Sequence, residues 1–301
     1  MIATDRMFEG VGVALITPFR NGAVDAPALA ALATRIVDRG ATSLYPCGCT
    51  GEATSLTRAE RGLVIRTVVE AARGKAAVIA GTGTAATAET IELSKEAITL
   101  GVDGVMVITP YSCRPTPEGQ IAHYRAVAEA IDRPIVLYNV PSRTGANVMP
   151  ETVARLAEHP RIAAIKEASG SVDQASAIRS RCDIAVLSGD DSLYLPLLAA
   201  GARGVVSVAG HLVADELVTM TAAFRAGRAA EAEAIHRRLH PLFRALFLET
   251  NPAPVKHALS VLGLASPDLR LPLVGVRPET ARAVEEALDR LGLRAVARAA
   301  H

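Results

Sequence analysis

Short apolar runs rich in β-branched residues alternate with longer segments of helical period along most of the chain. A strand with helices on both faces is a near-continuous hydrophobic run, so we interpret eight of these runs as strands. They cover residues 11–19, 42–48, 76–83, 103–110, 134–141, 162–168, 184–190 and 204–210. Helical periodicity between them predicts helices that include 26–39, 58–73, 87–100, 118–131, 150–158 and 192–200.

This alternation predicts a parallel sheet of the α/β class. Right-handed crossovers allow either an open doubly wound sheet or a closed barrel. Eight units over about 225 residues favour a (β/α)8 TIM barrel.

The strand pattern stops at about residue 212, and only helical patterns follow. These helices are predicted over 214–227, 229–249, 253–263 and 278–292. We therefore place a barrel that carries the active site in residues 1–225 and a C-terminal helical region, packed on the barrel, in 226–301. In helix 229–249 the apolar spacing predicts core or subunit packing by Leu239, Leu242, Phe243 and Leu246.

The composition is that of a globular protein with a large core. Hydrophobic residues make up 50% of the 301 residues, and 32 Lys and Arg balance 31 Asp and Glu. This balance argues against a nucleic-acid footprint or a polybasic membrane surface. No apolar run approaches the roughly 20 residues of a membrane span, and no secretory signal or disulfide framework is evident. We therefore expect a cytoplasmic protein.

A lysine closes the sixth predicted strand. Lys166 follows the apolar run 162–165 directly, and the chemistry of such barrels lies at the carboxyl ends of their strands. A low dielectric around an amine lowers its pKa, and a partly neutral amine can attack a carbonyl to form a Schiff base. The alternative is a lysine that reaches the surface or pairs with Glu167.

Three neighbouring features carry further candidate chemistry. Tyr138 ends the adjacent strand, where a phenol can move protons during imine formation; the alternative is a buried structural tyrosine. The turn "GCTGE" (48–52) offers backbone N–H groups to a carboxylate, but it is also an ordinary βα loop. The guanidinium of Arg143 can bind a second carboxylate through two parallel N–H groups; the alternative is a solvated loop arginine.

Other motifs are assigned structural roles. "GTGTAA" (81–86) lacks the third glycine of a dinucleotide site, and Cys47 with Cys49 lacks the further ligands of a zinc site. We predict that His211 is a solvated loop histidine. We also predict that the pair 190–191, two aspartates, caps the following helix, with one member holding the loop.

Six motifs, taken together, resemble the dihydrodipicolinate synthase/N-acetylneuraminate lyase family. They are "GCTGE", "TPY", "YNVPSRTG", "IKEASG", "LSGDD" and "NPAPVK", and the similarity runs from residue 8 to 292. The resemblance implies a pyruvate-dependent class I aldolase on a (β/α)8 barrel with a C-terminal helical region. "PSRTG" and "NPAPVK" are similar to the synthase branch rather than to the neuraminate lyases.

The resemblance implies a role for each matching residue. Lys166 matches the lysine that captures pyruvate as a Schiff base, and Tyr138 matches the tyrosine that shuttles protons there. Thr50 and the amides around it match the site of the pyruvate carboxylate. Arg143 matches the arginine that holds the carboxylate of the aldehyde substrate.

The resemblance also implies the reaction and the assembly. Gly189 and Val206 match positions that shape the pyruvate pocket. The implied reaction condenses pyruvate with aspartate 4-semialdehyde to 4-hydroxy-tetrahydrodipicolinate, for lysine and cell-wall synthesis. No metal or organic cofactor is implied, because the lysine supplies the electron sink. The implied assembly is a homotetramer, a dimer of dimers; a dimer is the alternative, because Ser112 removes one interface contact.

Two positions depart from the family pattern. Cys49 and Ser112 stand where the family has a threonine and a tyrosine. In the family these two residues form a proton relay with the tyrosine that Tyr138 matches. Cysteine donates weakly, and serine is too short to replace a phenol that reaches in from a neighbouring subunit. We therefore expect a slow condensation or a different substrate. The same imine chemistry in a 2-oxo acid aldolase or dehydratase, or a non-catalytic paralogue that binds a 2-oxo or amino acid, remain alternatives.

The family's lysine feedback site is also only partly matched. Tyr111 and Glu89 correspond to residues of that site. Ala53, Arg61 and Ala85 stand where the family has serine, histidine and asparagine. We predict weak or absent inhibition by lysine.

Overall fold

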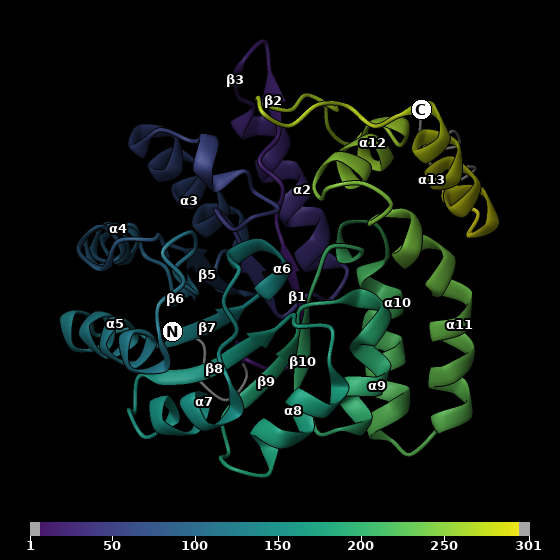
Figure 1. The fold of residues 1–301 in the computed structure, drawn as a ribbon. Helices are drawn as coiled ribbons and strands as arrows, with labels where there is room; N and C mark the ends of the chain where they lie inside the picture. The colour runs from purple at the N-terminus through teal and green to yellow at the C-terminus, as the bar shows by residue number, and fades with distance from the viewer. Residues whose placement is uncertain (1–6, 295–301) are drawn as a thin grey trace.

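A closed barrel of eight parallel strands forms the centre of the molecule (Figure 1). The computed structural model describes residues 7–294. The barrel strands are β1 (Gly10–Ala14), β4 (Ser43–Tyr45), β5 (Ala77–Gly81), β6 (Gly104–Ile108), β7 (Ile135–Asn139), β8 (Ile162–Glu167), β9 (Ala185–Ser188) and β10 (Gly204–Ser207). Their order around the barrel is β1-β10-β9-β8-β7-β6-β5-β4. The predicted barrel and all eight of its strands are confirmed.

Helices follow the strands and form the outer layer of the barrel. They are α2 (Ala26–Asp38), α3 (Arg58–Ala72), α4 (Thr87–Thr99), α5 (Pro117–Ala130), α7 (Pro150–Ala157), α8 (Val172–Arg179), α9 (Tyr194–Ala199) and α10 (Gly210–Arg225). Local sequence fixes several starts: Thr57 and Glu60 form a capping box for α3, and Thr116 caps α5 ahead of Pro117.

Short elements lie between the barrel strands and the outer helices. They are the hairpin of β2 (Phe19–Arg20) and β3 (Ala23–Val24), the helix α6 (Pro141–Thr144), and two 3₁₀ turns, η1 (Ala53–Ser55) and η2 (Asp191–Leu193). The predicted first strand, 11–19, therefore ran past β1 into the hairpin.

Up to residue 294, three helices form the C-terminal region on one side of the barrel (Figure 1). They are α11 (Ala229–Ala245), α12 (Ala253–Val261) and α13 (Pro278–Arg290). The apolar side chains predicted in α11 and just after it are confirmed as core, since they join the hydrophobic cluster that also lines the barrel strands: Leu239, Leu242, Phe243 and Leu246. The division after residue 225 stays a prediction.

Strand side chains alternate between two apolar layers, as the two-residue period of a strand requires. One layer packs between strands and helices and includes Val105, Leu137, Ile165, Val186 and Val205. The other fills the barrel interior and includes Ile79, Met106, Val136, Leu187 and Val206. Packing inside the barrel therefore leaves room for chemistry only at its ends.

A one-residue register shift interrupts β8. Ile135 of β7 pairs with Ile162, whereas the next residue, Val136, pairs with Ala164. A shift of one residue moves every following side chain to the opposite face. Ile162 and Ile165 consequently both face the helices, and Lys166 falls on the inner face, paired with Tyr138.

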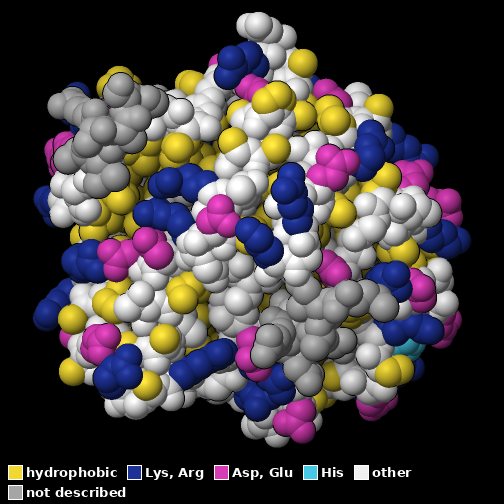
Figure 2. All heavy atoms as spheres, turned by 180° about the vertical axis from the view of Figure 1, so that it is seen from behind, with side chains coloured by type: hydrophobic (Ala, Val, Ile, Leu, Met, Phe, Trp, Pro, Cys, Tyr) yellow, Lys and Arg dark blue, Asp and Glu magenta, His cyan; other side chains and the backbone are white. Residues whose placement is uncertain are grey.

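The surface carries both signs of charge. On the face opposite to that of Figure 1, lysines and arginines are interspersed with aspartates and glutamates (Figure 2). None of the helices within residues 7–294 combines the length and the apolarity needed to cross a membrane.

Candidate active site

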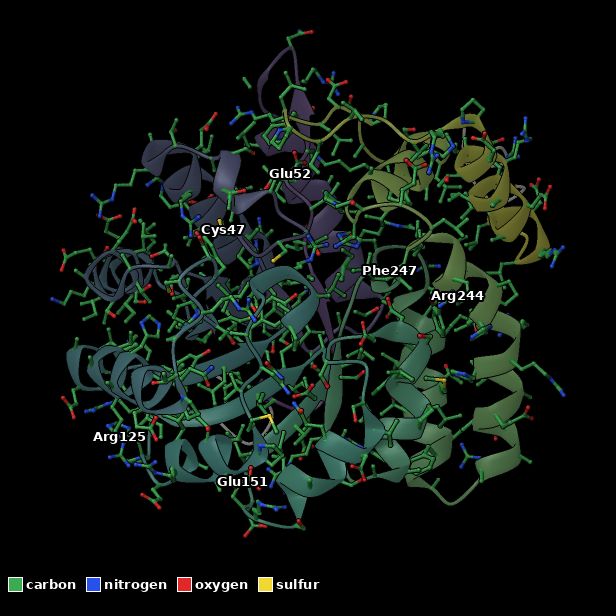
Figure 3. All side chains as sticks on the ribbon, in the orientation of Figure 1. Cys47, Glu52, Arg125, Glu151, Arg244 and Phe247 are labelled. Carbon is green, nitrogen blue, oxygen red and sulfur yellow. The ribbon has the colours of Figure 1, made fainter. Side chains whose placement is uncertain are left out.

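A cavity of about 660 Å³ opens at the carboxyl ends of the strands. Loops after β4 to β7 and the C-terminal region build its wall, which includes Cys49, Glu52, Glu89, Tyr111, Tyr138, Arg143, Asn251 and Arg270. In Figure 3, Cys47 and Glu52 lie near this end, away from Arg125 and Glu151 on the outer helices. The predicted chemistry therefore lies where a barrel places it.

Lys166 lies against the ring of Tyr138. Its Nζ is 4.2 Å from the ring centroid, and the two residues are paired in neighbouring strands. Lys166 is 5% exposed and Tyr138 is 6% exposed. Tyr138 belongs to the cavity wall, so the amine is withdrawn from water directly behind a side chain that faces the cavity.

Burial lowers the pKa of Lys166 to about 8. The nearby Cys49 and Asp190 side chains oppose the shift, and Arg143 adds to it. About a tenth of the amine is then neutral at pH 7, several hundred times more than for an ordinary lysine. The amine is thus prepared for attack on a carbonyl.

Glu167 does not serve as the partner of this amine. Its carboxylate accepts hydrogen bonds from Asn139 Nδ2 and Gln174 Nε2, both at 3.0 Å, and from the Ser169 N–H at 2.7 Å. These contacts tie the ends of β7 and β8 to α8. The alternative of a Lys166–Glu167 pair is therefore wrong.

Burial raises the pKa of Tyr138 well above its ordinary value, and the nearby Cys49 side chain adds to the rise. The phenol consequently stays protonated at neutral pH and is available as a proton donor. Cys49 is half-buried in the cavity wall. The structure thus brings Lys166, Tyr138 and Cys49 together.

Thr50 is buried in the turn after β4. Its Oγ1 accepts a hydrogen bond from Asn251 Nδ2 at 2.9 Å, and the carbonyl of Gly51 accepts one from Thr17 Oγ1 at 2.8 Å. The Glu52 N–H donates to the Cys49 carbonyl at 3.1 Å. The turn is therefore held from the segment that follows β1 and from the C-terminal region.

Arg143 reaches the cavity wall from α6 and donates to the Asn251 carbonyl at 3.1 Å. Gly189 follows β9, and a Cβ there would lie 2.4 Å from that of Ala168, so the position admits no side chain. Val206 is fully buried in the barrel interior.

Ser112 lies apart from these residues. It is exposed in the loop between β6 and α5, with a φ of +68°, and it is outside the cavity wall. Its neighbour Tyr111 belongs to that wall, so within this chain the loop contributes Tyr111 to the cavity rather than Ser112.

Two structural assignments are corrected. His211 is not solvated: it is 1% exposed, accepts from the Ile16 N–H at 3.1 Å and is bonded to the Val208 carbonyl at 2.8 Å. Asp191 holds the loop as predicted, but it does not cap the following helix. Its carboxylate instead accepts from the Val208 and Ala209 N–H groups before α10.

Sequence reasoning missed two contributors. Asn251 contacts both Thr50 and Arg143, and Lys256 forms a buried ion pair with Glu52. The signal was the motif "NPAPVK", which contains both Asn251 and Lys256 but does not reveal which distant residues they meet. No group of three His, Cys, Asp or Glu side chains within residues 7–294 gathers as a metal site.

Comparison with known proteins covers nearly the whole chain. Residues 7–291 match the model of the dihydrodipicolinate synthetase family. A 4-hydroxy-tetrahydrodipicolinate synthase of Cyanothece sp. is 49% identical over 290 residues, 95% of this chain and 99% of that protein. The dihydrodipicolinate synthase structure from Thermotoga maritima has a TM-score of 0.94 at 40% identity, covering 95% of this chain and 99% of that one. The corresponding structure from Cyanidioschyzon merolae, with lysine bound, has a TM-score of 0.93 at 41% identity, with the same coverage.

Proposed function

The chain belongs to the dihydrodipicolinate synthetase family, and we propose that it condenses pyruvate with aspartate 4-semialdehyde to 4-hydroxy-tetrahydrodipicolinate. It is then a class I lyase of lysine and diaminopimelate biosynthesis. The observation that carries the proposal is the buried amine of Lys166, 4.2 Å from the Tyr138 ring centroid, with its pKa lowered to about 8.

Lys166 acts as the nucleophile. Its neutral amine adds to the keto carbon of pyruvate, and loss of water gives a protonated imine. The imine withdraws electrons from the adjacent methyl group, which loses a proton to give an enamine. The enamine carbon then attacks the aldehyde carbon of the second substrate. The amino group of that substrate finally attacks the imine carbon, closes the ring and displaces the Lys166 amine, so that the cyclic product leaves and one water is lost overall.

Tyr138 supplies and takes up the protons of these steps. It gives a proton when the hydroxyl of the first adduct leaves as water, and it takes one back during release. Its raised pKa keeps it in the donor form at the start. Cys49 joins it as the neighbouring relay group. Ser112, on the exposed loop of a neighbouring subunit, stands at the third relay position, where its short side chain leaves the relay weak.

The remaining site residues bind the two substrates and shape the pyruvate pocket. Thr50 and the adjacent amides receive the pyruvate carboxylate, and Arg143 receives the carboxylate of the aldehyde substrate. Gly189 leaves space for pyruvate beside the end of β9, and Val206 forms the apolar floor. No metal or organic cofactor takes part, because the imine itself is the electron sink.

The assembly and location follow the same proposal. We place the active site in a barrel of residues 1–225 and the supporting helical region in 226–301. The protein works as a cytoplasmic homotetramer, a dimer of dimers. The charge-balanced face in Figure 2 is consistent with an enzyme of small-molecule substrates rather than a nucleic-acid binder.

A coupled assay tests the proposal. Pyruvate and aspartate 4-semialdehyde are supplied together, and the product is followed with an excess of the reductase that consumes it. The expected result is turnover that K166R abolishes and Y138F lowers by about a hundredfold, the usual contribution of a proton-transfer group. Absence of turnover with this aldehyde, alongside cleavage or dehydration of a 2-oxo acid, would contradict the proposed substrate.

A further inference from the structure

Glu52 places a buried carboxylate beside the turn that, under the proposed function, receives the pyruvate carboxylate. It is 3% exposed and belongs to the cavity wall. Two peptide units separate it from Thr50, so the two Cα atoms lie within about 7.6 Å of each other. A carboxylate left unmatched at this distance repels an anionic substrate.

Lys256 of α12 matches this charge. Its Nζ contacts Glu52 Oε1, and both side chains are essentially inaccessible to solvent. The same amine donates to the Asp268 carbonyl at 2.8 Å and lies 4.3 Å from the centroid of the Phe19 ring. The cation is therefore fixed in one place by three partners.

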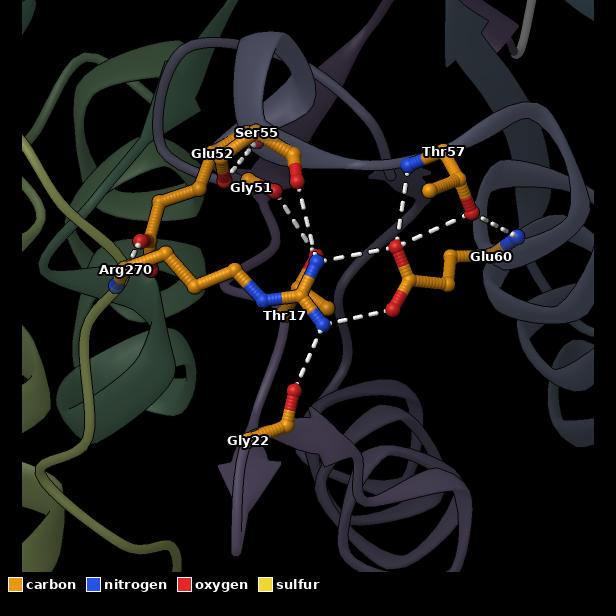
Figure 4. Close-up of polar contacts among 8 residues, drawn as sticks. All are labelled: Thr17, Gly22, Gly51, Glu52, Ser55, Thr57, Glu60 and Arg270. Carbon is orange, nitrogen blue, oxygen red and sulfur yellow. Dashed lines mark hydrogen bonds and ion pairs between the residues drawn. The ribbon is translucent and has the colours of Figure 1, made fainter.

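Arg270 does not take over this role. Its guanidinium binds Glu60 at two points and also donates to the carbonyls of Ser55 and Gly22 (Figure 4). Only its backbone N–H reaches Glu52, at Oε2 and 3.0 Å. The charge of Arg270 is thus matched by Glu60, and Lys256 remains the counter-ion of Glu52.

Stability alone does not account for the Glu52–Lys256 pair. Withdrawing two charges from water costs several kcal/mol per ion, and apolar replacements of such pairs are often neutral or stabilising. Glu52 also has a φ of +51°, in the left-handed region that residues other than glycine rarely adopt. Strained backbone of this kind is concentrated at functional sites.

We propose that Lys256 is a positioning residue for the keto acid: it neutralises Glu52, so that the turn 48–52 can accept the pyruvate carboxylate. Lys256 acts through Glu52 and does not touch the substrate. The proposal rests on the function proposed above, because it takes the turn as the carboxylate site.

Steady-state kinetics of K256M test the proposal, with both substrates varied separately. The KM for pyruvate is expected to rise about tenfold, the order expected for one unmatched charge at this range, while the KM for the aldehyde changes by less than about twofold. In E52Q/K256M the repelling carboxylate is also gone, and the KM for pyruvate returns to within about threefold of wild type. If the pair is purely structural, the KM for pyruvate in E52Q/K256M is at least as high as in K256M. That result overturns the proposal.

The exposed Lys75, paired with Asp38, provides the control: K75M leaves both KM values unchanged. If K256M does not fold, E52Q provides the test, because it removes the carboxylate and keeps the cation. A lower KM for pyruvate in E52Q supports the proposal, and a higher one overturns it. A wild-type enzyme that condenses the substrates, with an unchanged pyruvate KM in K256M, overturns the inference alone. A wild type that never captures pyruvate overturns both.

Discussion

The reactivity proposed for Lys166 depends on where its side chain is placed. The amine is buried in the barrel interior against an aromatic ring, where the charged form loses hydration that nothing nearby fully replaces. The carboxylate that could have restored an ordinary pKa, that of Glu167, is engaged with Asn139 and Gln174. The lowered pKa of the amine is therefore a property of the site before any substrate binds.

The pH dependence of pyruvate capture reports this environment directly. The neutral amine is the nucleophile, and its pKa is lowered to about 8, so capture accelerates as the pH rises and levels off above about 8. Between pH 6 and pH 8 the neutral fraction grows from about 1% to about half. Rapid-mixing measurements of imine formation from pH 6 to 10 check this, and a midpoint near that of a solvated lysine would contradict it.

The relay beside Tyr138 gives a second prediction at this scale. A thiol at Cys49 is a weak donor, and in the proposed assembly the exposed Ser112 is too short to reach the phenol of another subunit. We expect the double variant C49T/S112Y to condense the two substrates about tenfold faster than wild type, within the range of a general acid–base contribution.

Steady-state rates of the double variant and of each single variant measure this gain. The single variants serve as controls, because the relay needs both groups. No gain in kcat from the double substitution would count against a relay weakened at these two positions.

At the scale of elements, β8 shows what a sequence pattern can and cannot specify. The apolar run predicted the strand, and the polar residues after it predicted the site. The face on which Lys166 lies depends on the one-residue shift opposite Ile135 and Val136. That shift is a property of how two strands pair, so the run "IAAIKE" did not reveal it.

Contacts between elements that lie far apart along the chain could not be predicted from the sequence either. Glu52 and Lys256 lie 204 residues apart, and His211 meets Ile16 across 195 residues. Each residue occurs beside a recognisable motif, but local propensity contains no information on its partner. The residues with chemistry at strand ends, Lys166 and Tyr138, were predictable because the barrel brings all strand ends to one rim.

The link between β1 and the start of α10 yields a stability prediction. Burial lowers the pKa of His211 to about 4 from 6.5, so the unfolded chain binds the proton more readily than the folded one. Its contribution to stability is intact above pH 6.5 and is lost as the pH falls toward 4. The loss amounts to about 3 kcal/mol for a shift of this size.

Urea unfolding at pH 7 and at pH 4.5 checks this contribution. H211Q is less stable than wild type at pH 7, since it cannot keep both hydrogen bonds in the same geometry. At pH 4.5 the difference shrinks by about 2 kcal/mol, because residue 211 binds a proton in the unfolded wild-type chain and not in unfolded H211Q. Equal pH dependence in the two proteins would contradict the assignment.

At the scale of the whole molecule, the barrel and the C-terminal helices share the cavity. Asn251 and Arg270 belong to its wall, and the core of α11 is continuous with that of the strands. The C-terminal region therefore takes part in forming the site as well as in covering the barrel.

The same cavity wall predicts the response to lysine. Arg58 and Arg61 line its outer part together with Glu89, and Arg61 donates to the carbonyls of Ala53 and Gly81. The guanidinium of Arg61, fixed by these two carbonyls, opposes the binding of an ammonium group there. Activity titrated with free lysine is expected to show weak or no inhibition in the millimolar range, and inhibition at micromolar lysine would contradict this.

Capture of pyruvate by one amine is the most direct measurement of the central claim. The full-length protein is treated with pyruvate and borohydride together, and the intact mass is followed by peptide mapping. We predict one reduced pyruvate adduct per chain, on the peptide that contains Lys166, and none in K166R. An unmodified protein, or an adduct on another lysine, would contradict the account.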